Sequence, residues 1–324
     1  MIFNFFTIRN YNFIKSSTLS FCFLLLSIET ISSQVTLAEK LGYKKDAKLL
    51  IIHADDLGFS HAENIASIKA LDSGAVNSAS IMMPTPWVSE IVSYAQKNEG
   101  KHDLGLHLTI TSEWKNYKWS SVASKDKIPT LINSHGYFYN DCPSEANIAE
   151  VETELRVQIE LAYTMGIKPT HLDSHMGCLF WGKVDFFEVY LKLAKEFKLP
   201  CLIDKTFVSL FDNEEAFNRM LKAYKAMVVI DQNFTISEEE NAKDVAQYYI
   251  RTIKSLEPGL SQILIHTAYD NEEMQAITIE HPSWGAAWRQ ADFDFFTSDV
   301  CKNLIKEEEI VLVTWREIAE VLKN

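Results

Sequence analysis

Residues 48–60 read KLLIIHADDLGFS and organise the rest of the chain. The apolar run 49–52 is long enough for a strand buried on both faces, and Asp55 and Asp56 follow at its C-terminal end. Gly58 permits a turn, and Ser60 with Glu63 predicts a capping box at the start of a helix. We therefore expect two adjacent carboxylates on a strand-to-helix turn. Paired aspartates are also ordinary turn residues, so the pair alone does not define a site.

The composition is that of a globular chain with one large core. Of the 324 residues, 47% are hydrophobic and 12% aromatic, and the length lies in the size range of an α/β barrel. The 31 basic and 44 acidic residues give a formal charge of −13, which argues against nucleic acid or an anionic membrane surface as a partner. A neutral or cationic substrate fits this charge better.

The N-terminal residues 1–33 have the pattern of a targeting segment. Arg9 and Lys15 precede the apolar run 21–26, and small residues follow by position 33. This pattern predicts a cleaved secretory signal, a single mature domain over 34–324, and a secreted or periplasmic location. The apolar run is short for a membrane span, with a retained anchor as the alternative, and no later segment is expected to span a membrane.

Four cysteines follow the predicted signal, at positions 142, 178, 201 and 301. None has the C-x-x-C spacing of a zinc–thiolate site, so such a site is not expected. Export would permit disulfide bonds, and the sequence leaves the three possible full pairings open.

Strands and helices alternate along the rest of the chain. Apolar runs predict strands, amphipathic stretches predict helices such as 284–306, and residues 205–245 are less regular. The further predicted strands are 78–83, 104–110, 170–175, 201–204, 262–266 and 310–315. This order predicts an α/β fold with a single parallel (β/α) barrel, distorted or incomplete, whose functional groups lie at the C-terminal strand ends. An open doubly wound sheet is the alternative, but no G-x-G-x-x-G turn follows the first strand.

Histidines stand in or at the end of three predicted strands. His107 interrupts an apolar alternation, although a lone strand histidine is more often a core residue than a ligand. Alternation places His171, Asp173 and His175 on one face of the fourth predicted strand. Burial of such groups without partners costs on the order of several kcal/mol each, which implies a metal or a dense hydrogen-bond network. His266 ends a later apolar run.

Residues 111–142 lack periodicity and are rich in aromatic side chains. These are Trp114, Tyr117, Trp119, Tyr137, Phe138 and Tyr139. Such an insert after a strand can cover a site and stack on sugar rings, or it can form a minor hydrophobic cluster beneath a surface loop. The sequence leaves both interpretations open.

Together, the segments 55–56, 105–108 and 171–175 resemble the YdjC-like carbohydrate deacetylases, relatives in mechanism of the polysaccharide deacetylases. The family pattern is approximately A-D-D-[FL]-G, then G-[LM]-H, then T-H-x-D-S-H, then a late strand-end histidine, in the order found here. The resemblance covers residues 49–180, and more loosely the chain through His266 to the C-terminus. The sequence departs from the pattern at His53, where asparagine is common, and directly after His175 and His266.

The resemblance implies that Asp56, His107 and His175 bind a metal ion, that Asp55 is the general base and that His266 is the general acid. The family hydrolyses N-acetyl groups of amino sugars or their oligosaccharides, so the expected partner is an N-acetylated oligosaccharide. Two imidazoles and one carboxylate suit a divalent ion, Mg²⁺ or Zn²⁺, and leave positions for a water and an amide oxygen. A homodimer is left open.

Two other functions stay open at this point. The same metal ligands would serve an O-acetyl esterase or a phosphoesterase, although no Lys or Arg cluster flanks the motifs to hold a phosphate. A non-catalytic barrel that binds glycans is the second alternative, and the departures after His175 and His266 are compatible with it.

Overall fold

Seven parallel strands form one sheet in the computed structural model, which describes residues 35–73, 75–181, 183–224 and 228–323. The predicted signal segment, residues 1–33, lies outside the described residues. The spatial order is β4-β3-β2-β1-β6-β5, and β7 pairs with β1. The strands are β1 Lys48–Leu57, β2 Ser78–Ile81, β3 Leu104–Leu108, β4 Leu172–Ser174, β5 Gln232–Thr235, β6 Gly259–Ile265 and β7 Val311–Leu312.

Strand β1 lies at the centre of the sheet, and its apolar residues 49–52 are almost fully buried. Strand β6 pairs along one edge of β1, up to the pair of Ala54 with Ile265. On the other edge, β2 pairs from His53 onward. Because the strands are parallel, their C-terminal ends reach the same edge of the sheet, and this edge carries the candidate site.

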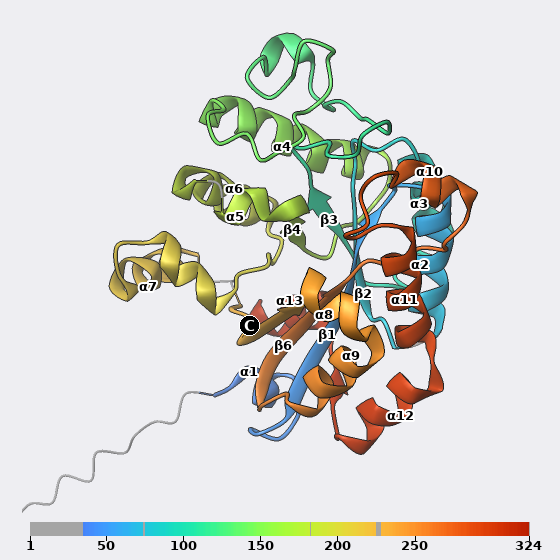
Figure 1. Ribbon diagram of the computed structural model, residues 1–324. Coiled ribbons are helices and arrows are strands. Elements are labelled where there is room, and N and C mark those ends of the chain that lie inside the picture. Colours follow the sequence, from blue (N-terminus) through green and yellow to red (C-terminus); the bar gives the residue numbers. More distant parts are fainter. Residues whose placement is uncertain (1–34, 74, 182, 225–227, 324) are drawn as a thin grey trace, which may run out of the picture. The chain divides into compact units, whose positions relative to one another are not determined.

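Helices flank the sheet in two groups (Figure 1). Helices α2, α9, α11 and α12 pack together beside β1, whereas α4, α5 and α6 pack together beside β3 and β4. The helices are α1 Leu37–Lys40, α2 His61–Ser73, α3 Val88–Lys97, α4 Ile148–Thr164, α5 Cys178–Trp181, α6 Val184–Phe197, α7 Glu214–Ala223, α8 Glu238–Lys243, α9 Val245–Lys254, α10 Glu272–Ile277, α11 Ala286–Thr297, α12 Asp299–Glu307 and α13 Trp315–Leu322. Short 3-10 turns occur at Lys125–Lys127, His175–Gly177 and Lys205–Leu210.

The predicted α/β barrel is confirmed as a curled parallel sheet with one distorted side. Residues 201–204, predicted as a strand, form isolated bridges instead. Leu172 of β4 bridges to Cys201, and Asp204 bridges to Ile230, just ahead of β5. The distortion therefore falls between the two edge strands of the sheet, β4 and β5.

Three other local predictions are wrong. Strand β5, with the sequence QNFT, lies in residues 205–245, the segment predicted to be less regular. It has no apolar run and is half-exposed, so an apolar pattern does not reveal it. The helix predicted over 284–306 divides at Ser298, which has an extended backbone and whose hydroxyl accepts a hydrogen bond from the Cys301 N–H at 3.2 Å. The last predicted strand shortens to β7, because Trp315 already begins α13.

Cys142 and Cys178 form a disulfide bond that joins the loop after β3 to α5. Cys201 and Cys301 are buried free thiols. Within the described parts of the chain, no helix combines the length and the apolar character that a membrane span requires.

Candidate active site

The C-terminal ends of β1, β3, β4 and β6 surround a cavity of about 740 Å³. All five residues to which the sequence assigns a role line it, namely Asp55, Asp56, His107, His175 and His266. They come from four strand ends that are far apart in the sequence. The structure thus brings together every residue that the sequence places in the site.

An irregularity near the end of β1, between Ala54 and Leu57, separates the two adjacent aspartates, which lie in the strand and not on the predicted turn after it. Asp56 has a positive φ of 73°, a conformation that aspartate tolerates better than most residues, and Gly58 follows with a φ of 94°. The Ser60 hydroxyl accepts a hydrogen bond from the Glu63 N–H at 3.1 Å, as predicted for a helix cap. The reciprocal half of the capping box is wrong, because the buried Glu63 carboxylate accepts a hydrogen bond from Ser67 at 2.6 Å instead.

Asp56, His107 and His175 form a cluster that we call the cavity cluster. Asp56 Oδ1 lies 3.4 Å from His107 Nε2 and 3.2 Å from His175 Nδ1. Although these atoms are close, Asp56 Oδ1 is buried without a hydrogen bond to any described residue. Three atoms that approach without bonding to one another are positioned to share a cation.

The charges around the cavity cluster also favour a cation. Burial opposes protonation of His175, but Glu113 and Asp56 outweigh burial and raise the pKa of His175 to about 9. His107 behaves similarly, since Asp173 and Asp55 outweigh burial and raise its pKa well above the ordinary value. A divalent ion would take the place of these protons. The donor set of two imidazoles and one carboxylate therefore fits a divalent metal.

Hydrogen bonds determine which nitrogen of the His107 and His175 rings faces Asp56 Oδ1. His107 Nδ1–H donates to Asp173 Oδ1 at 2.7 Å, which leaves Nε2 as the free ligand atom. The Nε2–H of His175 lies 3.1 Å from Glu113 Oε2, which leaves its Nδ1 free. Both rings are thus oriented by carboxylates on their far side.

Arg289 of α11 is a site residue that the sequence reasoning missed. Its Nη2 donates to Asp56 Oδ2 at 2.7 Å, and its Nε donates to the Trp284 carbonyl oxygen at 2.7 Å. Burial would raise the pKa of Asp56, but Arg289 and the two histidines lower it well below its ordinary value. Arg289 Nη1 is buried and has no hydrogen-bond partner among the described residues. Arg289 thus holds Asp56 in place from the side of α11.

Asp55 lies between the cavity cluster and a second group of ionisable residues. Its Oδ2 lies 3.8 Å from His107 Nε2 and 3.9 Å from His266 Nε2, while its Oδ1 lies 3.1 Å from His53 Nε2. Asp55 carries no salt bridge to Lys or Arg among the described residues, whereas Asp56 does. Asp55 thus contacts a histidine of each group and has no Lys or Arg partner among the described residues.

We call the second group, His53, His171 and Asp173, the inner cluster; it lies behind the cavity cluster and is almost fully buried. His53 Nε2 lies 2.8 Å from Asp173 Oδ2, and its Nδ1 lies 2.9 Å from Ser78 Oγ. Burial opposes protonation, but Asp173 and Asp55 raise the pKa of His53 to about 9. The His171 ring stacks on Trp315 and packs against Gly105, where a Cβ atom would collide with the ring. Gly105 is therefore required by close approach.

His266 differs from the other histidines of the site. Burial lowers its pKa to about 4, so the imidazole is neutral at neutral pH. Its backbone N–H donates to Asp292 Oδ2 at 3.0 Å, and the Tyr249 hydroxyl donates to Asp292 Oδ1 at 2.7 Å. Burial in turn raises the pKa of Asp292 to about 7.

The aromatic loop contains the predicted hydrophobic cluster together with exposed rings, whose stacking on a sugar stays a prediction. Trp114, Trp119 and Phe138 are buried, and the two tryptophan rings pack against Phe59. By contrast, Tyr137 and Tyr139 are 40% and 43% exposed. The tryptophans thus form a hydrophobic cluster, and the tyrosines are accessible to a ligand.

The sequence contains a signal for Arg289 but none for Glu113. Arg289, Phe293 and Phe296 follow helical spacing, so Arg289 occupies a position on the buried face of α11. A charged residue on an apolar helical face requires a partner. Glu113 lies in the loop without periodicity, and nothing in its local sequence indicates that it contacts His175.

Known proteins are similar to this chain over most of its length. The model of the family described as YdjC-like protein matches residues 49–307. A carbohydrate deacetylase of Thermus thermophilus is 29% identical over 289 residues, which cover 88% of this chain and 99% of that protein. One of Thermoanaerobacter pseudethanolicus is 25% identical over 83% of this chain and 98% of that protein. A crystal structure from Enterococcus faecalis V583 shares the fold, with a TM-score of 0.66 and 24% identity over 83% of this chain and 98% of that one.

Proposed function

Because this chain belongs to the YdjC-like protein family, we propose that it is a metal-dependent hydrolase that removes N-acetyl groups from amino sugars or their oligosaccharides. The observation that carries the proposal is the convergence of Asp56 Oδ1, His107 Nε2 and His175 Nδ1 at a cavity that Asp55 also lines. The relatives named carbohydrate deacetylases, similar over nearly their full length, support the same reaction.

In this proposal Asp56, His107 and His175 hold the ion. A divalent ion bound there, Mg²⁺ or Zn²⁺, would polarise the acetyl carbonyl group and acidify a water molecule. Asp55 accepts the proton of the attacking water as general base. Arg289 fixes the Asp56 carboxylate through its Nη2 and so positions one of the proposed ligands.

His266 supplies the proton that the leaving nitrogen needs. Since burial holds His266 neutral in the free protein, it must first gain that proton. Its Nε2 lies 3.9 Å from Asp55 Oδ2, so passage of the proton from Asp55 through His266 to the amine requires these two side chains to approach when the substrate binds. The proton balance then closes within the site, with acetate and the free amino sugar as products.

The charges at the cavity support an acetyl group over a phosphate ester. Arg289 is the one Lys or Arg side chain among the described residues that line the cavity, and Asp56 already pairs with it. A phosphate would need further cations to replace its hydration. We therefore propose an acetylated carbohydrate as the substrate.

We further propose that the protein is exported. Residues 1–33 carry the pattern of a secretory signal, and the disulfide bond between Cys142 and Cys178 suits an oxidising compartment. Localisation of the full-length chain by cell fractionation tests this, and retention in the cytosol would contradict it.

Acetate release from N-acetylated oligosaccharides tests the reaction. The protein is assayed after dialysis against a chelator and again after addition of Mg²⁺ or Zn²⁺, with matched O-acetylated sugars in parallel. We expect release from the N-acetylated sugars that stops with the chelator and returns with the metal. Release that the chelator does not change would contradict the metal role, and release from O-acetyl sugars alone would make the protein an esterase.

A further inference from the structure

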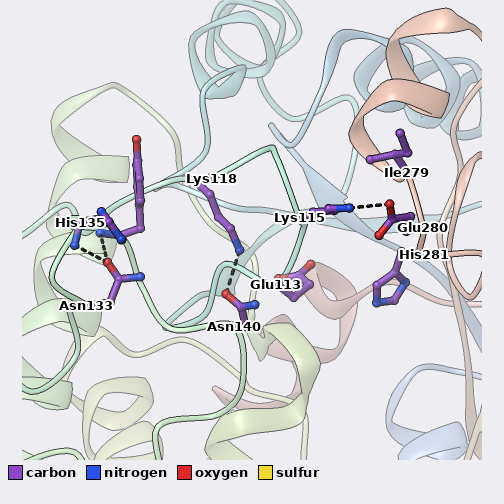
Figure 2. Close-up of a pocket in the computed structure, with 10 residues that line it drawn as sticks. Glu113, Lys115, Lys118, Asn133, His135, Asn140, Ile279, Glu280 and His281 are labelled. Carbon is purple, nitrogen blue, oxygen red and sulfur yellow. Dashed lines mark hydrogen bonds and ion pairs between the residues drawn. The ribbon is translucent and has the colours of Figure 1, made fainter.

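A second cavity, of about 480 Å³, lies beside the catalytic one, and we call it the rim cavity (Figure 2). Two segments far apart in the sequence form it: the loop after β3, at residues 113–140, and the turn between α10 and α11, at residues 279–281. An ion pair of 2.5 Å between Lys115 Nζ and Glu280 Oε1 joins the two segments (Figure 2). The volume falls within the range of small-molecule sites, about 300–1,000 Å³.

The rim cavity adjoins the catalytic cavity. Glu113, Asn140 and His281 line both of them. The Glu113 carboxylate reaches His175 of the cavity cluster, and the His281 ring lies 4.8 Å from the ring of Trp114, which also lines the catalytic cavity. The two cavities are therefore neighbours, and a linear molecule that extends beyond the catalytic cavity on this side would meet the rim cavity next.

The charges of the rim cavity balance. Lys115 and Lys118 face Glu113 and Glu280, and Lys115 pairs with Glu280. Lys118 Nζ donates to the Ser112 carbonyl oxygen at 2.6 Å and to Asn140 Oδ1 at 2.8 Å. Because both cations already have partners, this lining suits a neutral ligand with many hydroxyl groups better than a phosphate or a sulfate.

The accessible side chains have the chemistry that a sugar ring needs. Tyr137, 40% exposed, offers an aromatic face, and His135 and Asn140 are exposed polar groups. The tyrosine backbone is held by its own N–H, which donates to Asn133 Oδ1 at 3.2 Å. Removal of the Tyr137 ring would therefore leave the turn in place.

We propose that the rim cavity is a subsite for a further sugar residue of a neutral oligosaccharide whose N-acetylated residue occupies the catalytic cavity. The proposal rests on the proposed function and adds that the protein prefers longer substrates. Its prediction is a rise of kcat/KM with chain length, carried in part by Tyr137.

The test compares N-acetylglucosamine with its dimer and tetramer as probes. In the wild type, kcat/KM for the tetramer should exceed that for the monomer. In Tyr137→Ala this ratio should fall about two- to tenfold, the range expected for loss of one aromatic contact. Tyr43→Ala is the matched control, because Tyr43 is also 40% exposed but lies outside both cavities. Its ratio should equal that of the wild type.

Two results would overturn the subsite: equal kcat/KM for monomer and tetramer in the wild type, or an unchanged ratio in Tyr137→Ala. Tighter binding of a sulfated tetramer than of the neutral tetramer would overturn the claim that the rim cavity prefers a neutral ligand. If no probe releases acetate, the proposed function fails instead. In that case, calorimetric affinity for the tetramer still tests the subsite, which requires weaker binding by Tyr137→Ala than by Tyr43→Ala.

Discussion

The cavity cluster and the inner cluster contain the same residue types, yet their surroundings differ. Each brings three potential ligand atoms within 4.8 Å of one another. In the inner cluster, serine hydroxyls and the Asp173 carboxylate surround the His53 ring, and Trp315 and Gly105 enclose the His171 ring. Both clusters contain buried atoms without a hydrogen bond among the described residues, Asp56 Oδ1 in one and His171 Nε2 and Asp173 Oδ2 in the other. The clusters differ in access, because all three residues of the cavity cluster line the catalytic cavity, whereas His53 and His171 do not.

Since both clusters bring His and Asp ligand atoms together, access from a cavity is the feature that favours the cavity cluster as the site of the proposed metal. Asp173 connects the two clusters, because one of its oxygens contacts His53 and the other accepts a hydrogen bond from His107. We interpret the inner cluster as a charged support that orients the cavity cluster.

The largest expected effect separates catalysis from metal binding within the adjacent aspartates. Asp55→Asn should lower turnover about 10²–10⁴-fold, because it removes the general base. It should leave the metal content unchanged, since Asp56, His107 and His175 remain. Acetate release and elemental analysis of the purified variant measure the two effects.

Asp56→Asn is the matched variant, with the same change one residue further along the chain. It should lose both turnover and most of the metal, because a carboxylate ligand is removed. If instead Asp55→Asn emptied the site and Asp56→Asn kept the metal, the two roles would have to be exchanged.

A second prediction concerns the ion pair behind the cavity cluster. Arg289→Met should lower the free energy of unfolding by about 3–5 kcal/mol, because Asp56 would keep a buried charge without its partner. Urea unfolding measures this. Arg251→Met is the control, since the Arg251 side chain is 61% exposed and its pair with Glu240 should contribute at most about 1 kcal/mol. Bound metal should reduce the loss of stability in Arg289→Met. An equal loss in Arg289→Met and Arg251→Met would refute the stabilising role of the buried pair.

The sequence predicts the cavity cluster better than its support, for physical reasons. Asp55, Asp56, His107 and His266 lie in or directly after buried apolar strands, and parallel strands bring such positions to one edge. Arg289 and Glu113 reach the site from a helix and a loop, where no strand register fixes the direction of a side chain. Similarly, β1 is predictable from its apolar run, whereas the polar strand β5 depends on its pairing with β6.

The third prediction tests the charge of the inner cluster through pH. The pKa of His53 is raised from 6.5 to about 9, so its protonation should stabilise the fold below about pH 6.5. This contribution, about 3 kcal/mol, should be lost as the pH rises from about 6.5 to 9. His53→Asn should remove this pH dependence from the free energy of unfolding. His135→Asn, at an exposed histidine, is the control and should keep the wild-type slope.

A His53→Asn variant with the same slope as the wild type between these pH values would show that the inner cluster does not hold a proton at His53. If His53→Asn retains its metal, the inner cluster supports the cavity cluster without holding the ion itself.

The smallest expected effect links the aromatic loop to the cavity cluster through Glu113. Its carboxylate lies 3.1 Å from His175 Nε2 and directs the other nitrogen, Nδ1, toward Asp56. Glu113→Gln should weaken metal affinity about 10–100-fold, the usual cost of losing a carboxylate that orients a histidine ligand. Glu280→Gln removes the other carboxylate of the rim cavity, which pairs with Lys115 and contacts no histidine of the cluster, and it should leave the affinity unchanged. Titration with Mg²⁺ or Zn²⁺ in the presence of a competing chelator measures both affinities.

Since Glu113 is partly exposed, its replacement by glutamine should change the free energy of unfolding little. A variant that unfolded more easily but bound metal like the wild type would make Glu113 a structural residue of the loop.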